Sequence, residues 1–286
     1  GKDSLKANTT GDQCTAVGSL SLDANTTGTR NSALGVEALT ASTTGDNNTA
    51  LGHTALGNNT TGSASVAVGY NTLTANTTVG SMTAVGTDAF ASNTSGDKGV
   101  AIGFAALTAN TTAVHNTAVG YQALTANTTG GNNTAVGKGA LDANTTATNN
   151  TAMGVDALGA NTTGTENTAV GVGALDANTT ASYNTALGKD ALGANTTGEV
   201  NVGIGVNALL TNTTASQNTA VGTNAMYANT TGGNNVAIGH NTLDACTTGA
   251  SNTAVGKDAG TAVTTGVLNS LFGHDAGDSI TTGDSN

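Results

Sequence analysis

The sequence contains almost none of the large side chains that build an ordinary globular core. Its 286 residues include no Trp, no Pro, three Phe and four Tyr, whereas Gly reaches 41. Aromatic side chains supply much of the buried area in most cores, and the apolar residues here are mostly Ala and Val. A thick globular core is therefore excluded. Composition alone would also fit a disordered chain.

Charge is scarce as well, because only 9% of the residues are charged and the net charge of −11 is spread thinly along the chain. No basic patch is present that could neutralise phosphates, so nucleic acid is not expected as a partner. No run of 18 apolar residues occurs, and the first six residues lack the apolar segment of a signal peptide. We therefore expect no membrane insertion.

A strict repeat argues against disorder. Gly recurs every 17 residues, at 1, 18, 35 and onward to 273, without an insertion. The chain is therefore interpreted as a single repeat domain, 1–286, with sixteen full units and a 14-residue remainder. With this Gly as position 0 of the unit, all 25 charged residues and all four His fall at positions 1, 2, 5, 11 and 12. These five positions are expected to face water.

Two apolar positions are expected to form the core. Position 16 is always apolar, and position 4 is Leu in thirteen units. Representative members are Val119, Leu124, Val136, Leu141, Val170 and Leu175. Position 14, which is Thr, Ser or Val, is expected to point inward with position 16. The small residues at positions 15 and 0 would then face another chain, and the structural glycines Gly120, Gly137 and Gly154 would allow close approach or a backbone angle that only Gly adopts easily.

The pattern predicts an all-β fold, a parallel β-solenoid or β-roll of about seventeen 17-residue coils. Gly, Thr and Asn are poor helix formers, and each unit holds at least five of them. Each coil is expected to place a strand over the Asn-Thr-Ala-Val segment, a second short strand near Ala-Leu and a third near Asn-Thr-Thr. The absence of Pro leaves every backbone N–H free to donate to the next coil. Two large apolar residues per coil bury little against the entropy of ordering 17 residues. Association as a trimer or a filament is therefore expected.

The repeat resembles known surface fibres. Asn116-Thr-Ala-Val-Gly120 is similar to the strand repeats of trimeric autotransporter adhesin heads, and the longer string from Asn116 to Leu124 is similar to repeats of phage tail-fibre proteins. The resemblance implies an elongated trimeric β-roll on a virion or cell surface, hence extracellular. It implies a rigid structural shaft with an adhesive role toward a cell-surface receptor.

No catalytic, cofactor or metal site is expected, and the chain is interpreted as a non-enzyme. The His residues lie in variable surface columns, as do the carboxylates at position 5. Cys14 and Cys246 lie about 14 coils apart in the sequence, too far to pair within one chain.

Position 7 matches a modification pattern, and position 8 suggests an alternative function. Asn25, Asn127 and Asn229 match the glycosylation pattern Asn-x-Thr. The same column also holds Ser, Cys, Val and Ile, which favours an inward or stacked side chain. Position 8 is Thr in every copy, as a hydrogen-bonded ladder or an exposed row. An exposed row makes ice binding the alternative function, together with binding of a host receptor.

The last two units depart from the pattern. Gly260 and Gly277 replace Leu at position 4, and Val263 and Ile280 replace Asn at position 7, whereas the first unit resembles any internal one. This asymmetry predicts a joint at the C-terminal end and an N-terminal end that accepts another subunit.

Overall fold

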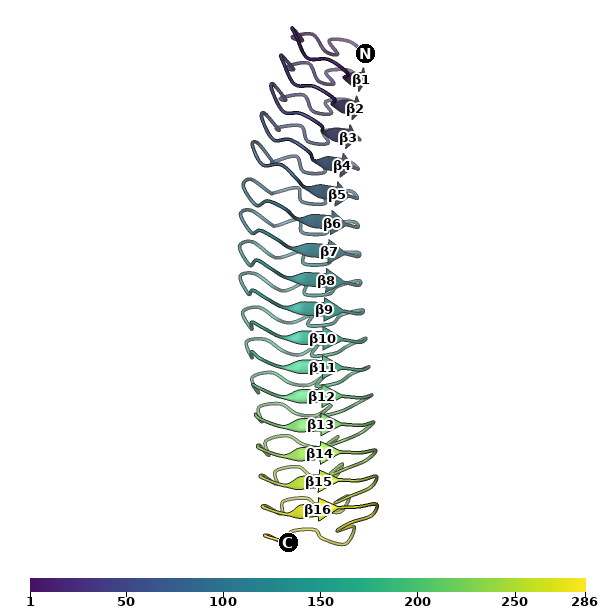
Figure 1. Ribbon diagram of the computed structural model, residues 1–286, viewed down its shortest axis with the longest axis vertical. Helices are drawn as coiled ribbons and strands as arrows, with labels where there is room; N and C mark the ends of the chain where they lie inside the picture. The colour runs from purple at the N-terminus through teal and green to yellow at the C-terminus, as the bar shows by residue number, and fades with distance from the viewer. The chain divides into compact units, whose positions relative to one another are not determined.

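The computed structural model describes residues 1–286 and contains parallel β-strands and no helix (Figure 1). Each 17-residue unit makes one coil, and positions 14 to 16 form its three-residue strand. The further short strands expected near Ala-Leu and Asn-Thr-Thr are wrong, since these segments form turns and bends. The predicted all-β parallel solenoid is thereby confirmed. The coils group into two compact units, residues 1–146 and 147–286.

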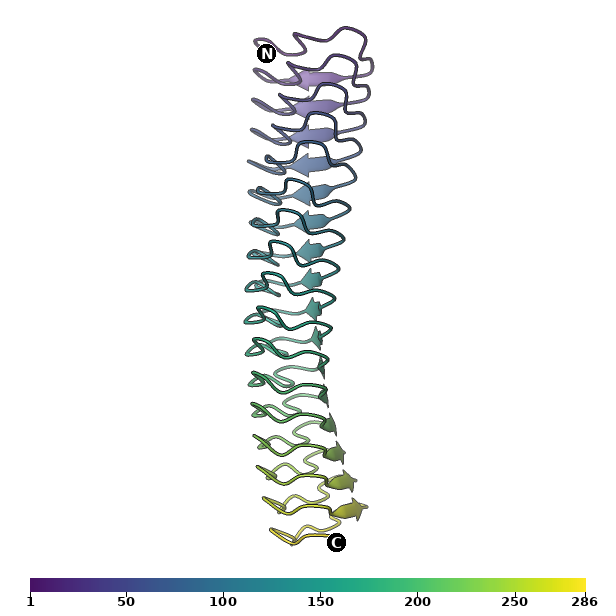
Figure 2. The same ribbon diagram turned by 90° about the vertical axis from the view of Figure 1, so that its left-hand side faces the viewer.

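Successive strands lie side by side within each unit (Figure 2). The first unit holds β1 (Thr15–Val17), β2 (Ser32–Leu34), β3 (Thr49–Leu51), β4 (Val66–Val68), β5 (Thr83–Val85), β6 (Val100–Ile102), β7 (Thr117–Val119) and β8 (Thr134–Val136). The second holds β9 (Thr151–Met153), β10 (Thr168–Val170), β11 (Thr185–Leu187), β12 (Val202–Ile204), β13 (Thr219–Val221), β14 (Val236–Ile238), β15 (Thr253–Val255) and β16 (Ser270–Phe272). Pairing is parallel and in register, so each residue meets its counterpart 17 positions on, as Thr117 meets Thr134.

The interior of each coil is narrow and lined by Ala and Leu. Leu124, Leu141 and Leu175 at position 4 are fully buried, as predicted. They contact the central residue of the strand, because a Cβ added at Gly203, position 15 of its coil, would lie 3.2 Å from Leu192 Cγ. The strand therefore turns its smallest residue toward the core.

The expected burial of Val119, Val136 and Val170 is wrong. These position-16 side chains are only half-buried, and they lie on the outer face of their strands together with position 14. Period-two alternation holds, but the face was assigned the wrong way round. Since the Ala at position 15 is covered by the chain's own leucines, the expectation that the Ala/Gly face meets another chain is also wrong.

The glycine at position 0 is required twice over. Gly120 has φ of +146° and Gly154 has φ of +144°, values that side chains rarely adopt. A Cβ on Gly120 would also lie 2.3 Å from the carbonyl oxygen of Gly137 in the next coil. Both explanations offered by the sequence, the special angle and the close approach, therefore apply.

Asparagine side chains fill the rest of the interior as two hydrogen-bonded ladders. At position 7, Asn127 Nδ2 donates to Asn110 Oδ1 of the preceding coil at 3.1 Å and to Gly130 O at 3.0 Å. At position 13, Asn116 Nδ2 donates to Gly130 O at 2.8 Å, and its Oδ1 accepts from the backbone N–H of Asn133 at 2.9 Å. Most of these buried amide groups find hydrogen-bond partners, which is why the interior tolerates them.

The position-7 ladder is interrupted at several points, one of which is a replaced Asn. Ser42 takes the place of Asn in its coil, and its hydroxyl oxygen is buried without a partner. Asn25 Oδ1, which faces it from the preceding coil, is also unsatisfied. An unsatisfied buried polar atom costs about 1–3 kcal/mol. Ser42 is therefore one local defect of the ladder, and Asn76 Oδ1 and Asn229 Oδ1 are unsatisfied at two further points.

Two other departures from the repeat are compensated by their neighbours. Phe90 replaces Leu at position 4, and a Cβ on Gly99 would lie 2.5 Å from Phe90 Cζ, so the ring occupies space that an Asn fills in other coils. Leu271 replaces Ala in β16, and its methyl groups lie where side chains on Gly260 and Gly277 would begin, at 3.0 and 2.7 Å. Near the C-terminal end, the larger side chain of Leu271 thus fills the space that Gly260 and Gly277 leave empty.

Position-0 glycine carries the first prediction. Gly120→Ala should lower the free energy of unfolding by at least about 2 kcal/mol, because the methyl group meets backbone and the backbone angle is strained. Gly131→Ala is the matched control, since the nearest atom to its Cβ would be Val114 O at 3.1 Å and its φ lies outside the left-handed region. We expect the control to stay within about 0.5 kcal/mol of wild type in urea unfolding followed by circular dichroism. Equal effects of both substitutions would contradict this role.

Repair of the ladder defect is the second prediction. Ser42→Asn should raise the free energy of unfolding by about 1–3 kcal/mol, because the new amide donates to Asn25 Oδ1 and its own oxygen accepts from Asn59. The reverse exchange in an intact part of the ladder, Asn127→Ser, should lower stability by a similar amount. Thermal unfolding of the two variants measures both signs, and a destabilised Ser42→Asn protein would contradict the ladder model.

Candidate interaction surface

The outer face of the strands is an uncharged surface in each unit. We name this face, made by positions 14 and 16 of β1–β8 in one unit and of β9–β16 in the other, the outer sheet face. It carries Thr, Ser or Val at position 14 and Val, Leu, Ile, Met or Phe at position 16, and no charged residue in any coil. The position-16 side chains that are clearly exposed are Val17, Leu34, Leu51, Ile102, Met153, Leu187, Ile238 and Phe272.

A shallow hollow marks this face over β1 to β3. Thr15, Ser32 and Thr49 form one side, and Leu34 and Leu51 form the other. The alanines of β2 and β3 lie between the two rows. Leu34 is 50% exposed and Leu51 is 42% exposed. Apolar area of this kind, repeated in every coil, is uncommon on soluble monomers, where large patches mark interaction sites.

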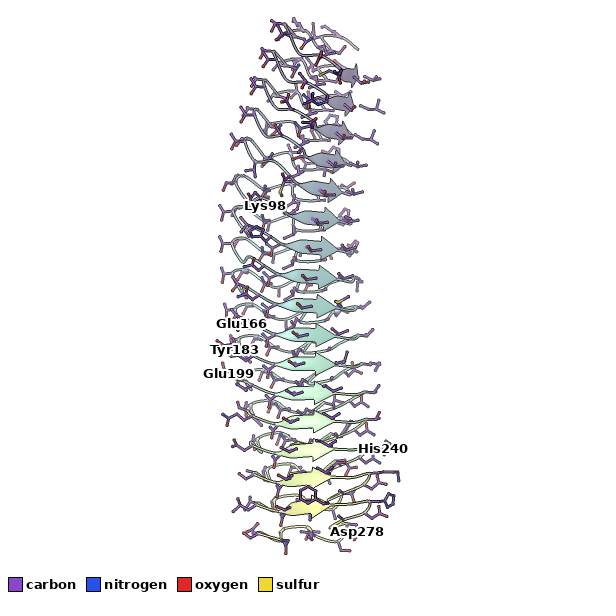
Figure 3. All side chains as sticks on the ribbon, in the orientation of Figure 1. Lys98, Glu166, Tyr183, Glu199, His240 and Asp278 are labelled. Atoms are coloured by element: carbon purple, nitrogen blue, oxygen red, sulfur yellow. The ribbon has the colours of Figure 1, made fainter.

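Charged side chains lie at the two edges of the sheet, off the strands (Figure 3). Lys98, Glu166 and Glu199 lie on the turns before the strands, and His240 and Asp278 lie on the opposite side. The backbone groups of the strands are already paired with neighbouring coils. A partner of the outer sheet face must therefore bind through side-chain packing rather than through strand addition.

Threonine occurs in two adjacent columns with different roles. At position 8 the hydroxyl bonds within the chain, as when Thr111 Oγ1 donates to Thr128 O at 3.1 Å. At position 9 the side chain is exposed in every coil, for example in Thr112 and Thr129, and the structure gives these hydroxyls no partner within the chain. The position-8 column is thus a hydrogen-bonded ladder, and the exposed row is position 9.

Position 1 forms an exposed column of mixed chemistry. His53 stacks on Tyr70 with ring centroids 5.6 Å apart, and Phe104 stacks on Tyr121 at 5.3 Å. Each pair joins successive coils. The ring faces are turned toward each other, so these aromatics stabilise the surface of the stack.

The predicted glycosylation acceptors are not accessible. Asn25, Asn127 and Asn229 are fully buried, and their amides donate hydrogen bonds inside the coil. An enzyme could reach them only before folding. The structure instead contains the inward, stacked side chains that the varied composition of position 7 indicates.

Both cysteines are free thiols. Cys246 is buried at position 7 of its coil, and this burial raises the pKa of its thiol to about 11. It therefore stays protonated and unreactive at neutral pH. Cys14 is half-buried and donates to Gly28 O at 3.3 Å.

Four carboxylate and imidazole groups come close together on the last coils. Asp258, His274 and Asp275 hold their ligand-type atoms within 4.8 Å of one another, and His240 Nδ1 lies 3.7 Å from Asp258 Oδ1. Sequence reasoning missed this cluster because position 1 and position 2 vary independently along the chain. The repeat could have revealed it, because residues 17 apart stack and bring Asp258 next to Asp275.

The comparisons with known proteins give no family. No family model matches the chain, and no curated protein matches it. No helix in the structure is long and apolar enough to cross a membrane.

Proposed function

We propose that this protein is a structural fibre or filament subunit that associates with further copies of itself through the outer sheet face. The observation that carries the proposal is the absence of charge from that face in every coil, combined with exposed Leu, Ile, Met and Val side chains. Water-facing columns elsewhere in the same repeat hold all the charged residues. Catalysis has no part in this proposal.

A second copy is the partner whose geometry fits. The coils repeat at about 4.8 Å, the spacing of neighbouring strands, so the eight strands of one unit present the same side-chain pair over about 34 Å. A partner that packs against all eight strands needs the same spacing between coils. It also needs the same alternation of a smaller side chain at position 14 with a larger one at position 16. This chain supplies both, and cyclic association of identical faces is the common form of homo-oligomer.

Several features suit a shaft. Every coil uses the same hydrogen bonds, so units can be multiplied without a new fold. The resemblance of Asn116–Gly120 to adhesin-head and tail-fibre repeats supports a trimer and a position on a virion or cell surface. An adhesive role would belong to the variable columns at positions 1, 11 and 12, where receptor contacts can change without disturbing the core.

Charge placed on the outer sheet face tests the proposal. The double variant Leu34→Asp/Leu51→Asp should convert an oligomer into monomers in sedimentation equilibrium at micromolar concentration, because repeated carboxylates would be desolvated in the interface. Far-UV circular dichroism should stay unchanged, since both side chains are exposed. Val36→Asp is the matched control, because Val36 is 43% exposed but lies at position 1. A monomeric wild-type protein, or an equal effect of Val36→Asp, would refute the proposal.

Ice binding is the second candidate, and the exposed position-9 threonines favour it. Sixteen of the seventeen copies are Thr and the other is Ser95, although the structure assigns these hydroxyls no hydrogen bond within the chain. Neighbouring exposed columns vary freely by comparison. A regular row of methyl and hydroxyl groups at the coil rise can order water without a pocket.

Ice binding has a direct test. Thermal hysteresis of the wild-type protein should appear at submillimolar concentration and fall strongly in Thr112→Lys/Thr129→Lys. Asn132→Lys, on the neighbouring position-12 column, should leave it unchanged. Absence of hysteresis in the wild-type protein would exclude this second function and leave the fibre proposal untouched.

A further inference from the structure

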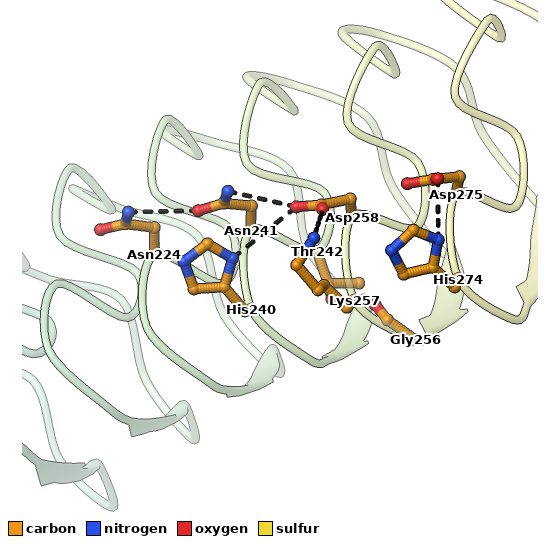
Figure 4. A network of polar contacts seen from close by, with 9 residues as sticks. All are labelled: Asn224, His240, Asn241, Thr242, Gly256, Lys257, Asp258, His274 and Asp275. Atoms are coloured by element: carbon orange, nitrogen blue, oxygen red, sulfur yellow. Dashed lines mark hydrogen bonds and ion pairs between the residues drawn. The ribbon is translucent and has the colours of Figure 1, made fainter.

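Three metal-ligating side chains meet across two neighbouring coils near the C-terminal end (Figure 4). Asp258 comes from position 2 of one coil, and His274 and Asp275 come from positions 1 and 2 of the next. Their ligand atoms lie within 4.8 Å of one another, and His274 Nδ1 lies 2.7 Å from Asp275 Oδ2. Metal–ligand bonds of about 2.0–2.2 Å place ligand atoms about 3–4 Å apart. The separations of the three ligand atoms are therefore close to those of a coordination site.

Asp258 is held in place by a row of amides. Asn241 Nδ2 donates to Asp258 Oδ1 at 3.2 Å, and Asn241 Oδ1 accepts from Asn224 Nδ2 at 3.2 Å. His240 Nδ1 approaches the same oxygen at 3.7 Å. The second oxygen of Asp258 is left to face a cation. Hydrogen-bonded partners that orient a ligating carboxylate are typical of metal sites.

The place of that cation is taken by Lys257. Its ammonium contacts Asp258 Oδ2 (Figure 4). The carboxylate therefore already attracts positive charge. A divalent ion carries twice that charge and gains the imidazole as a further ligand.

The arrangement differs from other histidines of the chain. His53 also lies at position 1, but position 2 of its own coil is Thr54 and that of the next coil is Asn71. His115 lies at position 12, on another column. The structure contains one group of three ligand-type side chains close together, and His274 is its imidazole. The two carboxylates come from adjacent coils.

We propose that Asp258, His274 and Asp275 bind a divalent transition-metal ion of the zinc type, which clamps two neighbouring coils together. One nitrogen and two oxygen ligands suit Zn²⁺, and water completes the coordination because the site is open to solvent. Lys257 is displaced when the ion binds. Because a clamp joins segments 17 residues apart, bound metal stabilises the folded coils by mass action.

Calorimetric titration of the whole chain with ZnCl₂ tests this site. We expect one saturable ion per chain in the micromolar range. His274→Ala and Asp258→Asn should each weaken binding by at least about tenfold, and Asn241→Ala by about tenfold through loss of orientation. Lys257→Met removes the competing ammonium and keeps the stem, so it should tighten binding severalfold. A rise in the thermal unfolding midpoint with zinc should follow the same order.

His53→Ala is the matched control and should bind zinc as the wild-type protein does. His274 is 61% exposed, so its truncation is not expected to unfold the chain, and circular dichroism checks each variant. If Asp258→Asn is misfolded, His274→Ala and Lys257→Met still decide the question. Binding only at millimolar zinc, equal loss in His53→Ala, or weaker binding in Lys257→Met would overturn the proposal.

Discussion

Stacking of each residue on its counterpart 17 positions away is the constraint on which the rest of the structure depends. Backbone N–H groups around the coil donate to the neighbouring coil, as Gly120 does to Ile102 O at 2.8 Å and Leu124 does to Ala140 O at 3.0 Å. The buried amides follow the same step, from Asn127 to Asn110. One insertion would shift all of these bonds at once, which explains why the register is unbroken over the whole sequence.

This stacking requires left-handed backbone conformations in each coil, and core packing determines which residues adopt them. Leu124 adopts φ of +52°, and the other leucines of position 4 do the same. A left-handed conformation costs about 1–2 kcal/mol in a residue with a side chain. Truncating a buried Leu costs about 2–5 kcal/mol, so Leu prevails over Gly at most copies. Position 2 is also left-handed but is only partly buried in most coils, and there Asp, Asn or Gly predominates because little core packing is lost.

Periodicity sufficed to predict the all-β solenoid, the coil length, the buried leucines and the need for Gly at position 0. It did not identify the face of the strand, because Thr-to-Val exchange at position 14 suits an exposed β-strand as well as a core. Burial of Ala at position 15 depends on the width of the coil, which a one-dimensional pattern does not contain. The cluster around Asp258 depends on side chains from two coils, and each column taken alone looks like ordinary surface.

Variation along the chain separates what the fold needs from what it leaves free. Exchanges in the core occur in compensating sets, such as Phe90 with Gly99 and Leu271 with Gly260 and Gly277, because interior volume is fixed. Exchanges at positions 1, 11 and 12 need no compensation. The outer sheet face belongs to neither class, since it is exposed and yet always uncharged. Solvent alone does not impose that restriction, and this is the observation on which the proposed self-association rests.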